Sequence, residues 1–409
     1  YRLDDYAAYC RMMRARLADT ITRSPDDIQA ADYPEPIAHC DICRWQAHCD
    51  QRRRADDHLS FIAGAARLHR NELEAHDVRT LAAAAQLALP IPFTPSRGSR
   101  DTYVRIREQA RVQLAQRERG RPVWELLDAP CAGLLRMPEP SPGDMFLDLE
   151  GARFAREGGR EYLFGLVSNG TYHPWWATTD AEERAAFEAV MDLIAQAWSR
   201  DPGMHVYHFG HYEVTAFKRL AGRYASRTEA LDALLRAERF VDLHTVTRQT
   251  LRAGVESYSI KQLEQYYGFE READLSTVGA WLHAAELALE AGLPREITQE
   301  VRTHVASYNA DDCRSTHALR DWLEGEVRAA ALERGDELPR PTPGDGQGSE
   351  QVTERDARVQ AIREQLLAGI DGDPADQAHP QHARWLLAYL IDWHRREERV
   401  AWWEYLRVL

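Results

Sequence analysis

The spacing of hydrophobic and polar residues changes near residue 140 and separates two kinds of predicted structure. Before that point, apolar residues recur at helical spacing over residues 59–90, which suits short helices joined at Gly64 or near Asp77. An arginine-rich helix is expected from about Thr102 to Arg119. The Pro- and Ser-rich stretches LPIPFTPSRGS and MPEPSPGD interrupt the pattern on either side of that helix.

From Asp144 onward, strand-like segments come first and then alternate with helical ones. Strands are predicted in MFLDLEG, EYLFGLVS, TYHPWWA, MHVYHFG and FVDLHTV. Helices are predicted in AEERAAFEAVMDLIAQAW, TAFKRLAGRY, SIKQLEQYY and residues 296–332. This order of elements predicts an α/β domain with a mixed sheet and flanking helices.

The composition after this domain predicts a linker, GDELPRPTPGDGQGSEQ, and then a further helical segment. We therefore expect five parts: a helical region with a cysteine cluster (1–58), a helical spacer (59–138), the α/β domain (139–328), a linker (329–356) and a helical segment (357–409). The last part carries an aromatic stripe, for which packing is the favoured interpretation and partner binding the alternative. Its members are Trp385, Tyr389, Trp393, Trp402 and Trp403.

The net charge of −14 argues against a protein that coats nucleic acid non-specifically, because such proteins neutralise phosphates with many cations. An enzyme with a local basic groove and an acidic metal site remains compatible with this charge. The sequence contains no apolar run of about 18 residues and no signal peptide, so we expect a cytoplasmic protein with no membrane partner. The missing start methionine and the abrupt C-terminus suggest a segment of a longer polypeptide.

Two carboxylates alternate with leucines in the first predicted strand. Since alternate side chains of a strand share a face, Asp148 and Glu150 point the same way, whereas Leu147 and Leu149 face the opposite layer. Adjacent carboxylates repel one another, and a hard divalent cation such as Mg²⁺ would compensate them. The alternative is a strand end whose acids face water.

Two further positions suggest the same chemistry. Tyr308 and Asp312 are four residues apart in a predicted helix and share a face, so the phenol could orient a water molecule beside the carboxylate. Glu213 follows a predicted strand and falls in the first turn of a helix, where an acid also favours the helix dipole. His208 and His211 nearby would contact phosphate or, as we favour, pack.

The order strand Asp-x-Glu, strand–turn–helix acid and helix Tyr-x-x-x-Asp resembles the DnaQ-like 3′–5′ exonucleases of the RNase H-like fold. The resemblance implies that two Mg²⁺ or Mn²⁺ ions are held by four carboxylates while a tyrosine positions the attacking water. The matching positions are Asp148, Glu150, Glu213, Tyr308 and Asp312, with Glu213 standing where the family usually has Asp. Asp242 is a spare candidate, although helix capping is the favoured interpretation for it.

Another stretch, from Val255 to Leu263, is similar to the S-x-K-x-L helix of YprB-like members of this group. In that comparison Lys261 would meet the nucleic-acid backbone.

Three cysteines near the N-terminus have the spacing Cys40-x2-Cys43-x5-Cys49, which indicates metal ligands rather than a disulfide framework. Zinc would need a fourth ligand, for which His39, His48 and Cys10 are the candidates. An iron–sulfur cluster would need a fourth cysteine, either Cys10 or one upstream of this segment. The alternative is three unrelated buried thiols.

The stretch HCDICRWQAHCDQRRR, followed by DDHLSFIAGAARLHRNEL, is similar to the C-terminal end of RecB-like PD-(D/E)XK nucleases with an iron–sulfur cluster (4Fe-4S). Residues 59–90 loosely resemble helix-hairpin-helix elements. The whole order resembles a bacterial family of large RecB-like putative nucleases, in which a superfamily 1 helicase follows. No Walker A motif occurs, so no ATP hydrolysis is expected from this segment.

These patterns together predict a metal-dependent nuclease, expected to be a 3′–5′ exonuclease on single-stranded DNA in a repair or defence helicase–nuclease. The alternative is a catalytically inactive RNase H-like scaffold that binds nucleic acid or the adjoining helicase.

Overall fold

A computed structural model describes residues 3–24, 26–28, 33–127, 132–342, 344–348, 350–370 and 379–408. Parts of the predicted N-terminal region, spacer, linker and C-terminal segment therefore lie outside the described residues. The chain divides into two compact units: Tyr1–Val123 with Gly254–Ser257, and Trp124–Ala253 with Tyr258–Leu409.

The first unit is helical. Its elements are α1 (Leu3–Ile21), η1 (Ala38–Ile42), α3 (Gln46–Ala55), η2 (Leu59–Phe61), α4 (Arg67–Ala75), α5 (Leu81–Ala85) and α6 (Arg100–Arg119). The predicted arginine-rich helix is confirmed as α6, which the Ser99 side chain caps and Gly120 ends in the left-handed conformation. Short helices also occupy residues 59–90 as predicted, with positive φ at Gly64 and Asp77 between them.

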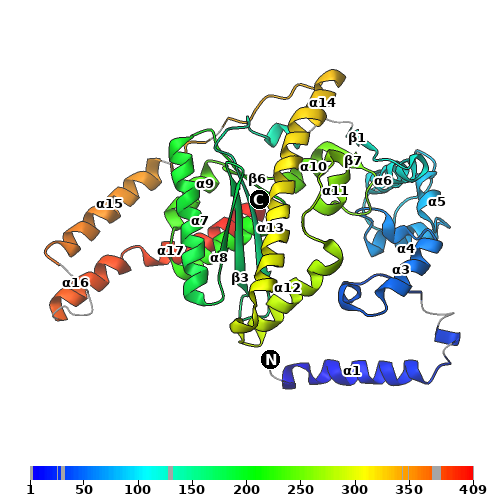
Figure 1. Cartoon of the computed structure of the whole chain (residues 1–409), viewed down its shortest axis with the longest axis horizontal. Helices are drawn as coiled ribbons and strands as arrows, with labels where there is room; N and C mark the ends of the chain where they lie inside the picture. The colour runs from blue at the N-terminus through cyan, green and yellow to red at the C-terminus, as the bar shows by residue number, and fades with distance from the viewer. Residues whose placement is uncertain are drawn as a thin grey trace. The chain divides into compact units, whose positions relative to one another are not determined.

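The second unit holds all the described strands (Figure 1). Its strands are β1 (Trp124–Leu126), β2 (Met145–Ala152), β3 (Arg160–Ser168), β4 (Thr171–Trp176), β5 (Val206–His208), β6 (Phe240–Asp242) and β7 (Leu251–Ala253). Its α-helices are α7 (Asp180–Arg200), α8 (Tyr212–Tyr224), α9 (Thr228–Arg236), α10 (Leu243–Thr250), α11 (Ile260–Tyr267), α12 (Leu275–Glu290), α13 (Gln299–Trp322), α14 (Arg328–Arg334), α15 (Glu350–Leu367), α16 (His379–Leu390) and α17 (Trp393–Val408). Shorter helical turns are η3 (Leu134–Arg136), η4 (Pro294–Glu296) and η5 (Leu323–Val327).

Five strands form the main sheet in the order β4-β3-β2-β5-β6. The hairpins β2–β3 and β3–β4 are antiparallel, whereas β2–β5 and β5–β6 are parallel. The predicted mixed α/β sheet is therefore confirmed, and β2, which carries the paired acids, lies at its centre.

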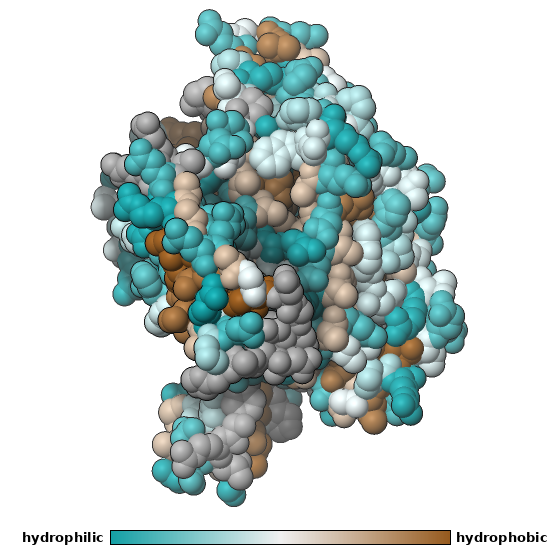
Figure 2. Space-filling model, turned by 90° about the vertical axis from the view of Figure 1, so that its left-hand side faces the viewer, coloured by the Kyte–Doolittle hydropathy of each residue, from teal (hydrophilic) through white to brown (hydrophobic). Residues whose placement is uncertain are grey.

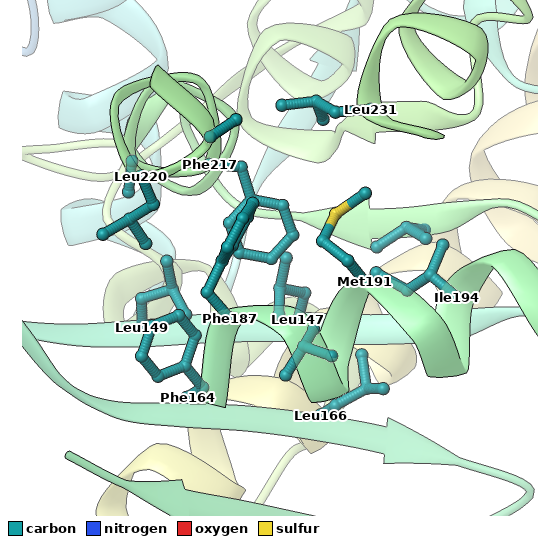
Figure 3. Packing of buried hydrophobic residues seen from close by; sticks show 14 of the residues in the cluster. Leu147, Leu149, Phe164, Leu166, Phe187, Met191, Ile194, Phe217, Leu220 and Leu231 are labelled. Atoms are coloured by element: carbon teal, nitrogen blue, oxygen red, sulfur yellow. The ribbon is translucent and has the colours of Figure 1, made fainter. Parts of the chain in front are cut away.

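Helices cover both faces of this sheet (Figure 1). On one face, leucines of β2 pack against α7 and α8 in a core that includes Leu147, Leu149, Phe187 and Phe217 (Figure 3). On the other face, α12 and α13 contact β2, and α13 also contacts β3. The alternation predicted for β2 thus places its leucines in one layer and leaves its carboxylates to face α13.

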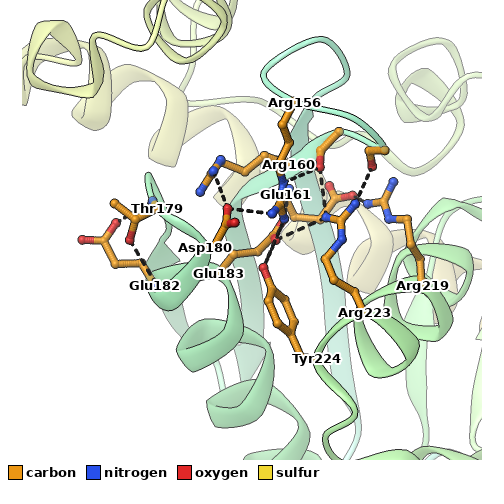
Figure 4. A network of polar contacts seen from close by, with 12 residues as sticks. Arg156, Arg160, Glu161, Thr179, Asp180, Glu182, Glu183, Arg219, Arg223 and Tyr224 are labelled. Atoms are coloured by element: carbon orange, nitrogen blue, oxygen red, sulfur yellow. Dashed lines mark hydrogen bonds and ion pairs between the residues drawn. The ribbon is translucent and has the colours of Figure 1, made fainter.

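Polar side chains fix the β2–β3 hairpin against α7 and α8 (Figure 4). Glu183 is fully buried, accepts a hydrogen bond from the Glu161 backbone N–H at 2.6 Å, and pairs with Arg156 and Tyr224. Thr179 and Glu182 cap α7 reciprocally. A buried carboxylate needs this many partners, because leaving it unpaired in the interior is costly.

Some predicted elements need correction. FVDLHTV is a strand only over Phe240–Asp242, because the Asp242 side chain accepts a hydrogen bond from the His244 N–H and starts α10 there. The helices α9 and α12 and the small antiparallel pair β1–β7 were not predicted. Three-residue strands carry too few positions to display a period.

Along the C-terminal aromatic stripe, only Trp403 is buried, and its indole Nε1 donates a hydrogen bond to Asp232 at 2.9 Å. Trp393 and Trp402 are each 55% exposed.

The face drawn in Figure 2 is mainly hydrophilic and is broken by hydrophobic patches. Among the described helices, none has the length and apolar character that a membrane crossing needs.

Candidate metal centre

Three acids from distant parts of the chain meet between β2 and α13. Asp148, Glu150 and Asp312 each offer a carboxylate oxygen, and these oxygens lie within 4.8 Å of one another. Strand alternation brings Asp148 and Glu150 to one face, and α13 lays Asp312 over them. Asp312 is 7% exposed, while the two strand acids are half-buried. The structure thus brings together three of the acids predicted from the sequence.

Burial and this proximity make ionisation of the two strand acids unfavourable. Burial, followed by the charges of Asp312, Glu150 and Glu213, raises the pKa of Asp148 well above its ordinary value. Burial and the charge of Asp312 raise the pKa of Glu150 to about 8. A divalent cation would relieve this repulsion, and carboxylate oxygens are the ligands that Mg²⁺ and Mn²⁺ prefer. The residues present therefore fit a divalent metal ion.

Two cationic side chains form ion pairs with Asp312. Lys261 Nζ lies 3.1 Å from its Oδ2, and an Arg271 guanidinium nitrogen lies 2.6 Å from its Oδ1. Both cations also lie over the Tyr308 ring, with Lys261 Nζ 4.8 Å and Arg271 Cζ 5.7 Å from its centroid. Burial and the charge of Asp312 raise the pKa of Tyr308, so its hydroxyl stays protonated at neutral pH.

Glu213 lies at the edge of this group. It is 3% exposed in the first turn of α8, and its charge contributes to the raised pKa of Asp148. His208 Nδ1 is 3.5 Å from Glu213 Oε2, an oxygen that accepts no hydrogen bond from the described residues. Glu213 does not belong to the group of oxygens that lie within 4.8 Å of one another.

The remaining predicted positions differ in their exposure. His208 is 3% exposed and faces Glu213; burial lowers its pKa, but the nearby Glu213 carboxylate outweighs this and raises it overall. His211 is exposed at the residue before α8. Asp242 accepts hydrogen bonds from the N–H groups of Gly210 and His244, which confirms the capping interpretation.

Sequence reasoning missed Asn309, the residue that contacts both strand acids. Its side-chain nitrogen lies 2.7 Å from Asp148 Oδ2 and 3.5 Å from Glu150 Oε1. It also missed Arg271, which no motif marks. The glycine within EYLFGLVS was a usable signal, because glycine inside a strand often marks a close approach of another group. That residue, Gly165, lies against Asn309.

The cysteine cluster stays a prediction. Cys40, Cys43 and Cys49 are free, half-buried thiols, and Cys10 is exposed. Among the described residues, they do not form a group of ligand atoms within 4.8 Å, whereas Glu35, His58 and Glu74 do. Arg70 pairs with Glu35 at 2.6 Å, and His58 accepts a hydrogen bond from the Ser60 N–H, so this second group has protein partners of its own.

The five-stranded mixed sheet with its flanking helices is consistent with an RNase H-like fold, and the trio of acids lies at its centre. Residues 145–324 match the family model described as the RNase H superfamily. The match supports nuclease-like activity on nucleic acid, and the matched range contains all the predicted catalytic residues. No curated protein and no solved structure matches the chain.

Proposed function

We propose that the second unit is a metal-dependent nuclease that hydrolyses phosphodiester bonds. The observation that supports this best is the convergence of Asp148, Glu150 and Asp312, whose oxygens lie close enough to share an ion. Residues 148 and 312 are too far apart in the chain for local structure to account for the cluster. The family match over residues 145–324 supports the same reaction class.

Asp148, Glu150 and Asp312 would hold the metal. A bound divalent cation supplies Lewis acidity that stabilises charge on a phosphate and lowers the pKa of water. Tyr308 keeps its proton and can orient a water by hydrogen bonding. Lys261 and Arg271 bring positive charge to this edge of the site, where a phosphate would be attracted.

The finer assignment is a 3′–5′ exonuclease that acts on single-stranded DNA with two Mg²⁺ or Mn²⁺ ions. Glu213 would serve as a fourth carboxylate; its buried Oε2 accepts no hydrogen bond from the described residues and lies 3.5 Å from His208 Nδ1. Lys261, and less directly His211, would contact the nucleic-acid backbone.

Cys40, Cys43 and Cys49 would hold an iron–sulfur cluster or zinc, and a superfamily 1 helicase would act in the same polypeptide or complex. Metal analysis and visible absorbance of the anaerobically purified protein test the cluster directly. Protein without iron or zinc would remove that proposal.

The nuclease proposal is tested with labelled single-stranded DNA and Mn²⁺, comparing the wild type with Asp148→Ala. We expect Asp148→Ala to abolish degradation, while the control Asp101→Asn, on the exposed first turn of α6, leaves it unchanged. A 5′ label that yields a ladder of shortened products would support 3′–5′ polarity, and resistance of circular DNA would support exonuclease action. Undiminished cleavage by Asp148→Ala would reject the assignment of the site.

A second candidate is an inactive scaffold that binds nucleic acid, favoured by the position of Glu213 outside the group of three acids. In that case the wild type would retain DNA in a mobility-shift assay, would not cleave it with either metal, and would bind it equally well after Asp148→Ala.

A further inference from the structure

Asn309 is fully buried on α13, at the point where the helix crosses β2 and β3. Its neighbours on the helix include Val305, which is buried in the apolar core, and Asp312, which belongs to the metal site. A buried amide has four hydrogen-bonding positions to satisfy, so its partners decide its orientation.

Those partners settle which way the amide points. Carboxylates that hold a cation are ionised and only accept hydrogen bonds, so the Nδ2 group must face Asp148 Oδ2 at 2.7 Å and Glu150 Oε1 at 3.5 Å. The amide oxygen then faces the hydroxyl of Tyr172, which donates to it at 2.8 Å. Tyr172 belongs to the edge strand β4, so one chain of hydrogen bonds runs from β4 through α13 to β2.

The sheet makes room for this amide through a glycine. Gly165 on β3 lies opposite Asp148 in the β2–β3 register. A Cβ built at residue 165 would lie 1.6 Å from Asn309 Oδ1 and 3.0 Å from Tyr172 Cε2. A methyl group therefore cannot share this space with the amide and the tyrosine ring.

We propose that Asn309 is a positioning residue that orients the Asp148 and Glu150 carboxylates for cation binding. Tyr172 orients its amide, and the absence of a side chain at Gly165 leaves space for it. By occupying one oxygen of each acid, the amide leaves the other oxygen to face the ion. This inference rests on the proposed metal-dependent function and assigns a role to a residue outside the acidic group.

The test measures Mn²⁺ affinity of the full chain by calorimetry and by electron paramagnetic resonance of free Mn²⁺. We expect Asn309→Ala and the similarly sized Asn309→Leu to weaken Mn²⁺ binding by about 10- to 100-fold, as for other residues that orient metal ligands. Tyr172→Phe keeps the ring but removes the hydroxyl donor, and should weaken binding in the same direction by less.

Val305→Ala is the matched control. Val305 is fully buried on the same helix but contacts neither acid through a hydrogen bond, so its truncation should lower the melting temperature and leave Mn²⁺ affinity unchanged. A structural role for Asn309 alone would give the same result as Val305→Ala. Wild-type affinity in folded Asn309→Ala and Asn309→Leu would therefore overturn the proposal.

The outcome separates this inference from the proposed function. A wild type that binds Mn²⁺ but does not cleave DNA removes the nuclease function, and weakened binding in the Asn309 variants would still support the positioning role. Conversely, a wild type that cleaves DNA, with Asn309 variants that bind Mn²⁺ normally, removes only the role of Asn309.

Discussion

Replacing Glu150 with glutamine should stabilise the metal-free protein at alkaline pH. Glu150 is half-buried beside Asp148 and Asp312, and burial with the charge of Asp312 raises its pKa to about 8. Between its ordinary pKa of 4.5 and about pH 8, the folded chain holds a proton that the unfolded chain has released. The folded state then binds more protons, so the free energy of unfolding falls as the pH rises through this interval.

The size of the effect follows from the shift. The whole change from 4.5 to about 8 corresponds to about 4.8 kcal/mol. Because Glu150 is half-buried, solvent screening reduces this contribution to about 2 kcal/mol. A change of that size moves the melting temperature of a domain of this length by roughly 4–8 °C. Glutamine keeps the shape and the acceptor oxygen facing Asn309 but removes the charge.

The assay is thermal unfolding in EDTA at about pH 5 and about pH 8, the two sides of the titration. We expect Glu150→Gln to melt above the wild type at the higher pH and close to it at the lower pH. Excess Mn²⁺ should reverse the order, since the wild type gains binding energy that the variant lacks. Glu333→Gln, at an exposed position on α14, serves as the control for loss of one charge. Equal pH dependence of the wild type and Glu150→Gln would refute the reasoning.

Three further predictions test other parts of the second unit. Arg320→Ala should lower the free energy of unfolding, measured by urea denaturation, by about 3–5 kcal/mol, because Asp144 then stays buried without the guanidinium that lies 2.5 Å from it. A loss below about 1 kcal/mol would contradict this. Asp242→Ala should cost about 1 kcal/mol through loss of the α10 cap yet keep wild-type Mn²⁺ affinity in calorimetry, and a large loss of affinity would make it a ligand after all. Gly165→Ala should weaken Mn²⁺ binding as Asn309→Ala does, because the alanine methyl group would displace the Asn309 amide. Unchanged Mn²⁺ binding would show that α13 shifts to make room for the methyl group.

The sequence alone determined the local geometry of the site. The alternation in MFLDLEG placed Asp148 and Glu150 on one face of β2 and the leucines in the core, because the period of a strand is a property of its backbone. Four-residue spacing likewise placed Tyr308 and Asp312 on one side of α13. The order of strands and helices along the chain was enough to predict the mixed α/β sheet, and the resemblance of the acid motifs to DnaQ-like exonucleases predicted that the acids converge.

Tertiary structure alone decided which groups surround those acids. Lys261 and Arg271 pair with Asp312 although they precede it by 51 and 41 residues in the chain. Asn309 contacts Asp148 only because α13 crosses the sheet beside Gly165. The periodicity of a sequence predicts on which face of its own helix or strand a side chain lies. It does not predict which residues of other helices and strands that side chain contacts. The order of the strands and the place of Glu213 beside, rather than within, the trio depend on packing between distant segments.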